Sequence, residues 1–454
     1  MKNTFYKLGF ALSLIFIISS CEVDEVEDPN NPSLGSVLND ASKAELQTLV
    51  SGLEARHRAF YGSATQMFGS FGRELWAYFQ SDARFVADWL GIGLDGVTYP
   101  DFFASGGTYI TPYLAVKQAN TLIDAANSST ALTEQERNGY IGFARTIKAY
   151  QLLIPLMQQF QNGIRVDVND PLNPGPILSY DAALQAIRDL LDQAQNELNG
   201  SSFAFSLAGF DEFDTPESFT QLNRAIAARA SLYAEDWAGT LTHLSDSFLN
   251  LEAGAEQMNV GPTIVYGEAP DVNNPLFYPP DAATNTIVIV HPALIEDAIP
   301  GDLRVENKFF KRKEAVFNPG VTDADGNDIP GEYQDNRWAS NIAPIRFIRN
   351  EELILIYAEA SAKLDNTNDA VDAINLVRNT WEIGNYTGST LETDLIDEIL
   401  FQRRYSLWAE AGHRWIDLRR TDRLNDTYID LRDRGSIFNQ VSRRTSETNW
   451  DASN

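Results

Sequence analysis

Apolar residues recur at the spacing of amphipathic helices along much of the chain. The first such segment follows Ser42 and Glu45, which have the spacing of an N-terminal capping box. Its apolar face has positions i, i+3, i+4 and i+7 occupied by Leu46, Leu49, Val50 and Leu53. We therefore predict a helix that begins after Ser42. His57 lies four residues beyond Leu53 on the same face, so we interpret it as a packed core histidine.

Three further segments have the pattern of paired helices. They cover residues 114–162, 179–233 and 353–377, and Thr133 with Glu136 predicts a second capping box inside the first of them. Small alanines recur on the contact faces, which lets paired helices approach closely, as in tetratricopeptide repeats. No pair repeats a consensus. The pattern predicts a mainly helical, all-α fold with four degenerate tetratricopeptide-like hairpins.

Two stretches between these helices have a different character. Residues 66–113 contain 12 of the 50 aromatic residues, and residues 258–348 contain 10 of the 19 prolines. The second stretch includes a β-prone run at 286–290, which favours a small hairpin. We interpret both stretches as long structured loops on a helical scaffold, and ligand recognition is commonly placed on such loops.

Composition narrows the class of protein. The 454 residues are 44% hydrophobic, enough for a large core, and 35 basic against 63 acidic side chains give a net charge of -28. That charge would repel nucleic acid and anionic membrane surfaces. The only cysteine is Cys21, so neither an intrachain disulfide nor a cysteine-based metal site is possible.

The N-terminus has the features of a lipoprotein signal peptide. Lys2 and Lys7 precede an apolar run at 8–18, which is shorter than the ~20 residues needed to span a bilayer. Small residues then lead directly to Cys21, matching the bacterial lipobox. We predict a signal peptide over 1–20, lipidation of Cys21 by diacylglycerol and a fatty acyl chain such as palmitate, a solvated acidic tether to residue 40, and one domain over 41–454.

The most specific residues lie near the C-terminus. The informative segments are 347–360, 373–378 and 399–404, and Ser389 with Glu392 predicts a helix cap between the last two. The strongest segment reads Glu410-Ala411-Gly412-His413-Arg414-Trp415-Ile416-Asp417-Leu418-Arg419-Arg420. Residues 344–421 closely resemble the C-terminal signature of the SusD/RagB family of surface nutrient-binding lipoproteins. The chain departs from that signature at Gln402 and Ser406, where the family commonly has Glu, and at 378–380, where Arg-Asn-Thr replaces Arg-Ala-Gly.

The resemblance implies a SusD-like fold, with four helical hairpins on one side and loops that form a ligand face on the other. It also implies a protein of polysaccharide utilisation, anchored by lipid in the outer membrane and facing the cell exterior. Family members capture oligosaccharides, or in some cases peptides, and deliver them to a SusC-like TonB-dependent transporter. The acidic tract after Cys21 similarly resembles the export signal of Bacteroidetes surface lipoproteins.

Glycan capture requires aromatic faces for the apolar side of a pyranose, and planar polar groups for its hydroxyls. Both loop stretches supply such residues. The candidates in the first stretch are Trp76, Asp82, Arg84, Trp89 and Tyr99. Those in the second stretch are Tyr333, Trp338 and Asn341, with Trp338 favoured because polar residues surround it. The alternative is that these aromatics fill the core. The charged set Arg403, Arg404, Arg414 and Asp417 is interpreted as a buried network, with ligand binding as its alternative.

The sequence contains no recognisable catalytic motif, and its four histidines are scattered. Residues 91–96 fit the letters of a dinucleotide fingerprint, but no strand precedes them, so we predict a turn. Residues 323–334 have the spacing of a calcium loop except at Asp328 and Gln334, which favours a hairpin turn at Asp325-Gly326 over calcium. We predict a binding protein without cofactor or metal. A peptide-binding protein, a purely structural transporter subunit and a glycan-cleaving enzyme are the alternatives.

Overall fold

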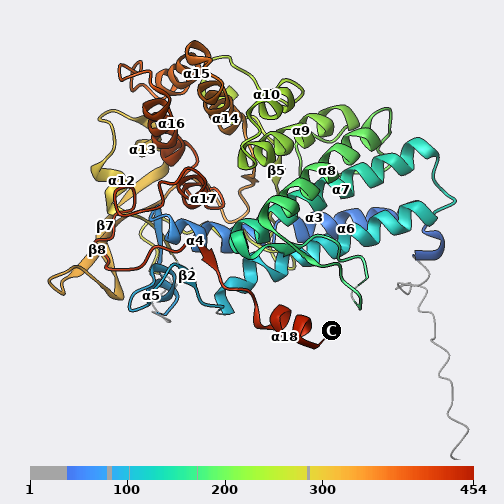
Figure 1. Ribbon diagram of the computed structural model, residues 1–454, viewed down its shortest axis with the longest axis horizontal. Helices are drawn as coiled ribbons and strands as arrows, with labels where there is room; N and C mark the ends of the chain where they lie inside the picture. The colour runs from blue at the N-terminus through green and yellow to red at the C-terminus, as the bar shows by residue number, and fades with distance from the viewer. Residues whose placement is uncertain (1–37, 79–83, 102, 171, 284–286, 454) are drawn as a thin grey trace, which may run out of the picture.

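The structure is a computed structural model and describes residues 38–78, 84–101, 103–170, 172–283 and 287–453 (Figure 1). The predicted signal peptide, the lipidated Cys21, the tether as far as residue 37, and Asp82 lie outside the described residues. Arg84 begins a helix, but its side chain also lies outside the description.

Packed helices form most of the molecule, so the predicted mainly helical fold is confirmed (Figure 1). The principal pairs are α6 (Ile110–Ser128) with α7 (Glu134–Gln159), α8 (Tyr180–Leu198) with α9 (Pro216–Tyr233), and α14 (Asn350–Lys363) with α15 (Thr367–Thr380). In addition, α3 (Lys43–His57) packs on α6, and α10 (Trp237–Ser245) packs on α9 and α14. The remaining helices are α4 (Tyr61–Phe71), α5 (Arg84–Leu90), η1 (Phe103–Thr108), η2 (Phe160–Asn162), α11 (Ala255–Met258), α12 (Pro292–Glu296), α13 (Leu303–Lys308), α16 (Glu392–Ser406), α17 (His413–Arg420) and α18 (Thr445–Ser453). Within the described ranges, none of these helices is long and apolar enough to span a bilayer.

Two of the three predicted helix caps are confirmed. The Ser42 hydroxyl accepts the Glu45 amide at 3.3 Å, and the Glu45 carboxylate accepts the Ser42 amide at 2.8 Å. Thr133 and Glu136 make the same reciprocal pair at the start of α7. The cap predicted at Ser389 is wrong, because α16 begins later, after Leu391, and the Ser389 hydroxyl instead accepts the Leu391 amide at 3.2 Å.

A four-stranded antiparallel sheet joins the two loop stretches. Its order is β1 (Leu75–Tyr78), β6 (Ile287–Val290), β8 (Asp328–Asp335) and β7 (Phe309–Thr322). The predicted β-prone run forms β6, and the predicted hairpin is the β7–β8 pair. Pairing of β1 with β6 was not predicted. Three small ladders join β2 (Thr98–Tyr99) to β10 (Gln440–Val441), β3 (Ile164–Arg165) to β4 (Ile177–Leu178), and β5 (Thr263–Ile264) to β9 (Ile345–Arg346).

Two predicted turns are confirmed. The Asp323 carboxylate accepts the amides of Asp325 and Asn327 at 2.9 and 2.8 Å, and Gly326 has a φ of +85°. Asp323 therefore closes the β7–β8 turn with its side chain. Residues 91–96 follow helix α5 rather than a strand and turn through glycines of positive φ, so the dinucleotide fingerprint has no strand to support it.

A buried charge network joins the C-terminal helices. Arg403 on α16 pairs with Asp417 on α17 at 2.6 Å, and Arg420 lies 2.9 Å from the same carboxylate. Arg420 also pairs with Glu359 on α14. The side chains of these four residues are at most 7% exposed. The predicted network is therefore present around Arg403 and Asp417, and it ties three helices together.

The other two arginines predicted for this network have different partners. Arg404 pairs with Asp297 at 2.7 Å near the surface. Arg414 donates to the carbonyl oxygen of Tyr428 at 3.1 Å. Both side chains hold neighbouring segments against α16 and α17, which is a structural role, but neither pairs directly with Asp417 in the way that Arg403 does.

Candidate ligand-binding site

A cleft of about 330 Å³ opens beside Trp338, within the size range of ligand sites. We call it the Trp338 cleft. It is lined by Tyr61, Asn259, Asn307, Lys308, Arg337, Trp338, Pro344, Arg346, Arg349, Glu351, Trp381 and Glu410. These residues come from the ends of α4 and α13, the segment after β8, strand β9, and the C-terminal helices, so the cleft exists only in the folded chain.

The orientation of Trp338 is fixed by its neighbours in sequence. Strand β8 ends at Asp335, whose carboxylate accepts the Trp338 indole N–H at 3.1 Å and the Arg337 guanidinium at 2.7 Å. The guanidinium lies 4.8 Å from the ring centroids of both Trp338 and Trp408. The indole is thus held at its polar edge while the partly exposed ring lines the cleft. A ring already held in place loses little entropy when a ligand stacks on it.

The inner wall of the cleft is charged but internally paired. Arg349 contacts Glu410 at 3.0 Å and also pairs with Glu351. Burial raises the pKa of Glu351, but the charges of Arg349, Lys308 and Arg304 more than offset burial and hold that pKa at about 2. Burial lowers the pKa of Arg349, and the two carboxylates offset this and raise it above its usual value. The Arg349–Glu351 pair therefore remains ionised at neutral pH. Burial lowers the pKa of Lys308 in the same wall to about 7, and its amine donates to the backbone carbonyls of Tyr405 and Ser406.

The low pKa of Glu351 predicts a pH-dependent stability. Because the folded pKa of about 2 lies below the ordinary value of 4.5, the stabilisation is complete above about pH 5 and is lost as the pH falls toward 2. The expected loss from this one group is about 3 kcal/mol. Urea unfolding at several pH values should show a shallower acid dependence for Glu351→Gln than for the unaltered protein. Identical slopes would contradict the assignment.

Three predicted ligand contacts in the first loop stretch are buried in the core. Trp76, Trp89 and Tyr99 are 1%, 4% and 0% exposed. Trp76 lies on β1, a strand whose four residues are all buried, and the Tyr99 ring packs 5.2 Å from that of Phe71. The placement of these three rings on the ligand face is thus corrected: they fill the interior, so no ligand could stack on them.

The other candidates of the second stretch lie outside the cleft. Tyr333 on β8 lines a separate hollow of about 270 Å³ with Glu296 and Arg432. The Asn341 carbonyl accepts the Asn274 amide at 2.7 Å, so Asn341 ties its loop to the neighbouring one. Of the six predicted ligand residues whose side chains the structure describes, Trp338 alone lines the cleft. Sequence reasoning missed Arg349 and Glu351, although both lie inside the C-terminal signature.

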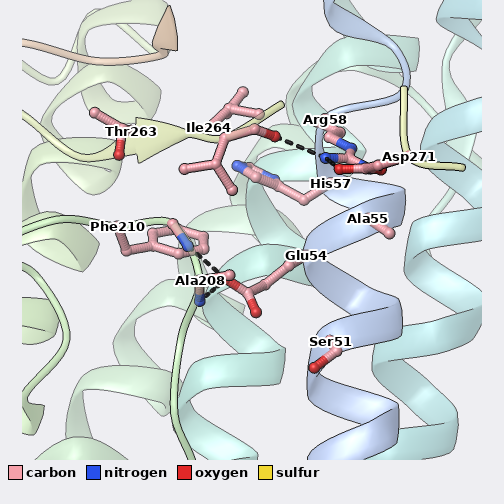
Figure 2. Close-up of a pocket in the computed structure, with 12 residues that line it drawn as sticks. Ser51, Glu54, Ala55, His57, Arg58, Ala208, Phe210, Thr263, Ile264 and Asp271 are labelled. Atoms are coloured by element: carbon pink, nitrogen blue, oxygen red, sulfur yellow. Dashed lines mark hydrogen bonds and ion pairs between the residues drawn. The ribbon is translucent and has the colours of Figure 1, made fainter. Parts of the chain in front are cut away.

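Strand β5, which pairs with β9, lines a third hollow of about 250 Å³ against α3 (Figure 2). His57 lies there and is 1% exposed, so its prediction as a core histidine is confirmed. Its ring stacks on Phe210, with centroids 5.5 Å apart, and Gln151 lies 2.9 Å from its Nδ1. Burial lowers the pKa of His57 to about 3, so the ring is neutral.

Polar side chains of α3 surround the same hollow (Figure 2). Glu54 accepts the backbone amides of Ala208 and Gly209 at 2.9 and 3.0 Å. Arg58 pairs with Asp271 and donates to the Val265 carbonyl at 2.7 Å. These contacts fasten loops 208–210 and 263–271 to α3, beside the ladder that borders the Trp338 cleft. Within the described part of the chain, no three His, Cys, Asp or Glu side chains are grouped to hold a metal ion.

Comparison with known proteins agrees with this architecture. Residues 327–453 match the model of the SusD family. Surface glycan-binding protein A from Bacteroides uniformis has a TM-score of 0.65 at 14% identity, with 91% of this chain and 99% of that chain covered. The same protein from Bacteroides thetaiotaomicron, in complex with laminarihexaose, gives 0.65 at 14% identity over 90% and 97%. NanU of B. fragilis gives 0.59 at 17% identity over 92% and 95%.

The structural matches define the fold as SusD-like along nearly the whole chain. The sequence match adds the family signature over the C-terminal region that forms α14 to α18. The chain therefore has a SusD-like fold, and its residues 327–453 match the SusD family in sequence. A search of curated protein sequences returned no significant match.

Proposed function

We propose that the protein is a surface receptor that binds oligosaccharides in the Trp338 cleft and passes them to a SusC-like TonB-dependent transporter. In this proposal Cys21 carries the lipid that anchors the protein to the outer membrane, facing the exterior. The observation that carries the proposal is the Trp338 ring, held by Asp335 and Arg337 beside a cleft lined with polar groups. A glycan-bound structure with the same fold supports this ligand class.

The chemistry of the cleft suits a sugar. A pyranose presents an apolar face that stacks on an indole, and its hydroxyls both donate and accept hydrogen bonds. Exposed side chains at the rim can meet those hydroxyls, namely Asn259, Asn307 and Arg346. Arg349, Glu351 and Glu410 already pair with one another, so these three groups do not require an ionic ligand, which favours a neutral glycan.

The same wall argues against glycan cleavage. A glycosidase needs one carboxylic acid that is protonated near neutral pH to donate a proton to the leaving oxygen. Glu351 has a pKa of about 2 and is paired with Arg349, so it is ionised and neutralised by that partner. Binding without turnover is the expected activity of this cleft.

Replacement of Trp338 by alanine is expected to weaken glycan binding by about 30-fold or more, as for a central aromatic anchor. Calorimetric titration against plant, microbial and host oligosaccharides, with laminarihexaose included, would measure this. Trp237→Ala is the matched control, because Trp237 is a partly exposed tryptophan on α10 that packs against Lys363 and does not line the cleft.

The titration also separates the alternatives. Equal losses in the two variants would remove the Trp338 cleft as the site. Saturable heat with peptides only would indicate a peptide receptor, and no heat with either class would indicate a structural subunit of the transporter. Release of shorter sugars during the titration would establish an enzyme.

A further inference from the structure

A hollow larger than the Trp338 cleft lies apart from it. It has a volume of about 550 Å³ and lies between α6, the segment 165–174 and the C-terminal helix α18. Figure 1 shows α18 at the lower edge of the molecule, next to the C-terminus. We call this hollow the α18 groove. It shares no lining residue with the Trp338 cleft, and its walls include Tyr113, Lys117, Asn120, Asp124, Asn169 and Trp450.

Helix α6 presents one polar face to this groove. Tyr113, Lys117, Asn120 and Asp124 are spaced three or four residues apart, which places them on one side of the helix. Asn120 is only 8% exposed, and its amide nitrogen has no hydrogen-bond partner among the described residues. A buried amide without an acceptor is costly, so a groove ligand that supplies an oxygen atom would be stabilised there.

The opposite wall is held in place by a buried arginine. Arg165 pairs with Glu447 on α18 at 2.9 Å and also with Asp451. The hydroxyl of Tyr113 donates to the Arg165 carbonyl at 2.7 Å. These contacts fix α18 across the groove, and they bring the partly exposed indole of Trp450 to the same hollow as the ring of Tyr113.

The charges around the groove indicate a neutral ligand. Arg165 pairs with the two carboxylates of α18, and Arg443 lies 4.0 Å from one of them, so these four charges balance. Lys117 and Asp124 likewise have opposite signs. What the groove offers beyond these charges is two aromatic rings, the amides of Asn120 and Asn169, and small hydroxyls. Aromatic faces with amides and hydroxyls match a polyhydroxylated ring compound better than a charged peptide or a phosphate.

We propose that the α18 groove is a second binding site for a neutral oligosaccharide, independent of the Trp338 cleft. This goes beyond the proposed function, which needs only one site. Two sites on one chain would raise the effective affinity for a glycan long enough to reach both of them, and would also retain a released end near the receptor.

The two sites each contain a tryptophan, which permits a direct test. The full chain labelled with 5-fluorotryptophan would be titrated with cellohexaose, maltohexaose, mannohexaose, xylohexaose and chitohexaose, with the ¹⁹F signals assigned through Trp450→Phe and Trp338→Phe. The expected result is a saturable shift of the Trp450 signal that persists in Trp338→Ala. The exposed variant Asp124→Ala, which should fold normally, is expected to weaken that response by about tenfold through loss of a charged hydrogen-bond acceptor.

Two results would overturn the inference. One is a Trp450 signal that none of these sugars moves, and the other is a shift that disappears in Trp338→Ala, since Trp450 would then only sense the other site. The proposed function has its own test in the same experiment: it is contradicted if the Trp338 signal does not respond to any of the sugars. A Trp450 shift produced equally by a neutral tetrapeptide would overturn the assignment of a sugar to the groove.

Discussion

Replacing Asp417 with alanine is expected to lower the free energy of unfolding by about 3–5 kcal/mol, the cost of breaking a buried ion pair from one side. The substitution leaves Arg403 and Arg420 without the carboxylate that both of them contact, and their side chains are 1% and 7% exposed. Water cannot replace the lost partner at those positions. Urea unfolding followed by tryptophan fluorescence would measure the change.

The matched control removes a carboxylate from an exposed pair. Glu332 lies 3.7 Å from Lys311, with side chains 50% and 64% exposed, so Glu332→Ala should cost less than about 1 kcal/mol. If Asp417→Ala proves no more harmful than Glu332→Ala, the charge network does not hold α14, α16 and α17 together, and packing of the apolar residues alone must do so.

Replacing Gly412 with alanine is expected to destabilise the fold by about 2–5 kcal/mol. Gly412 precedes α17 with a φ of +84°, where a side chain costs about 1–2 kcal/mol. An added Cβ would also lie 2.1 Å from the Cβ of Phe68 on α4, and such overpacking costs about 1–3 kcal/mol more. The same unfolding experiment applies.

Gly326 provides the control that separates these two costs. Its φ is +85°, almost the same as that of Gly412, and an added Cβ would meet no atom within 4 Å. Gly326→Ala should therefore show only the backbone cost of about 1–2 kcal/mol. Equal effects of the two substitutions would mean that α4 shifts away from α17 without loss, and that the close approach at Phe68 is not a constraint.

The two loop stretches show where sequence reasoning succeeds and where it fails. Both stretches are rich in aromatic or polar residues, and both were predicted to supply ligand contacts. Trp338 does line a cleft, because the polar residues next to it in sequence, Asp335 and Arg337, hold it there. Trp76 is buried, because β1 pairs with the distant strand β6 and the indole packs in a cluster with Ile289 of that strand and Val321 of β7. The local sequence shows the polar neighbours of Trp338, but it does not show the tertiary packing that buries Trp76.

The features that were predicted correctly are local, or they belong to a sequence signature. Helical periodicity, the caps at Ser42 and Thr133, and the turn at Gly326 follow from hydrogen bonds and steric limits between near neighbours. The C-terminal signature resembles that of the SusD/RagB family, and it predicted a charge network of Arg403, Arg404, Arg414 and Asp417, of which the Arg403–Asp417 pair is present. These features need no knowledge of distant contacts.

The positions of the Trp338 cleft and the α18 groove depend on the tertiary structure. The Trp338 cleft is lined by residues that are distant in sequence, among them Tyr61, Trp338 and Glu410. The α18 groove is likewise lined by α6 and by the C-terminal helix α18. Neither set of neighbours can be predicted from the spacing of residues in the sequence, because the packing of distant segments depends on which surfaces bury each other best. The residue type determines which environment is favourable for a side chain. The packing of remote elements determines whether that side chain lies in the core, beside a charged partner or in an open cleft.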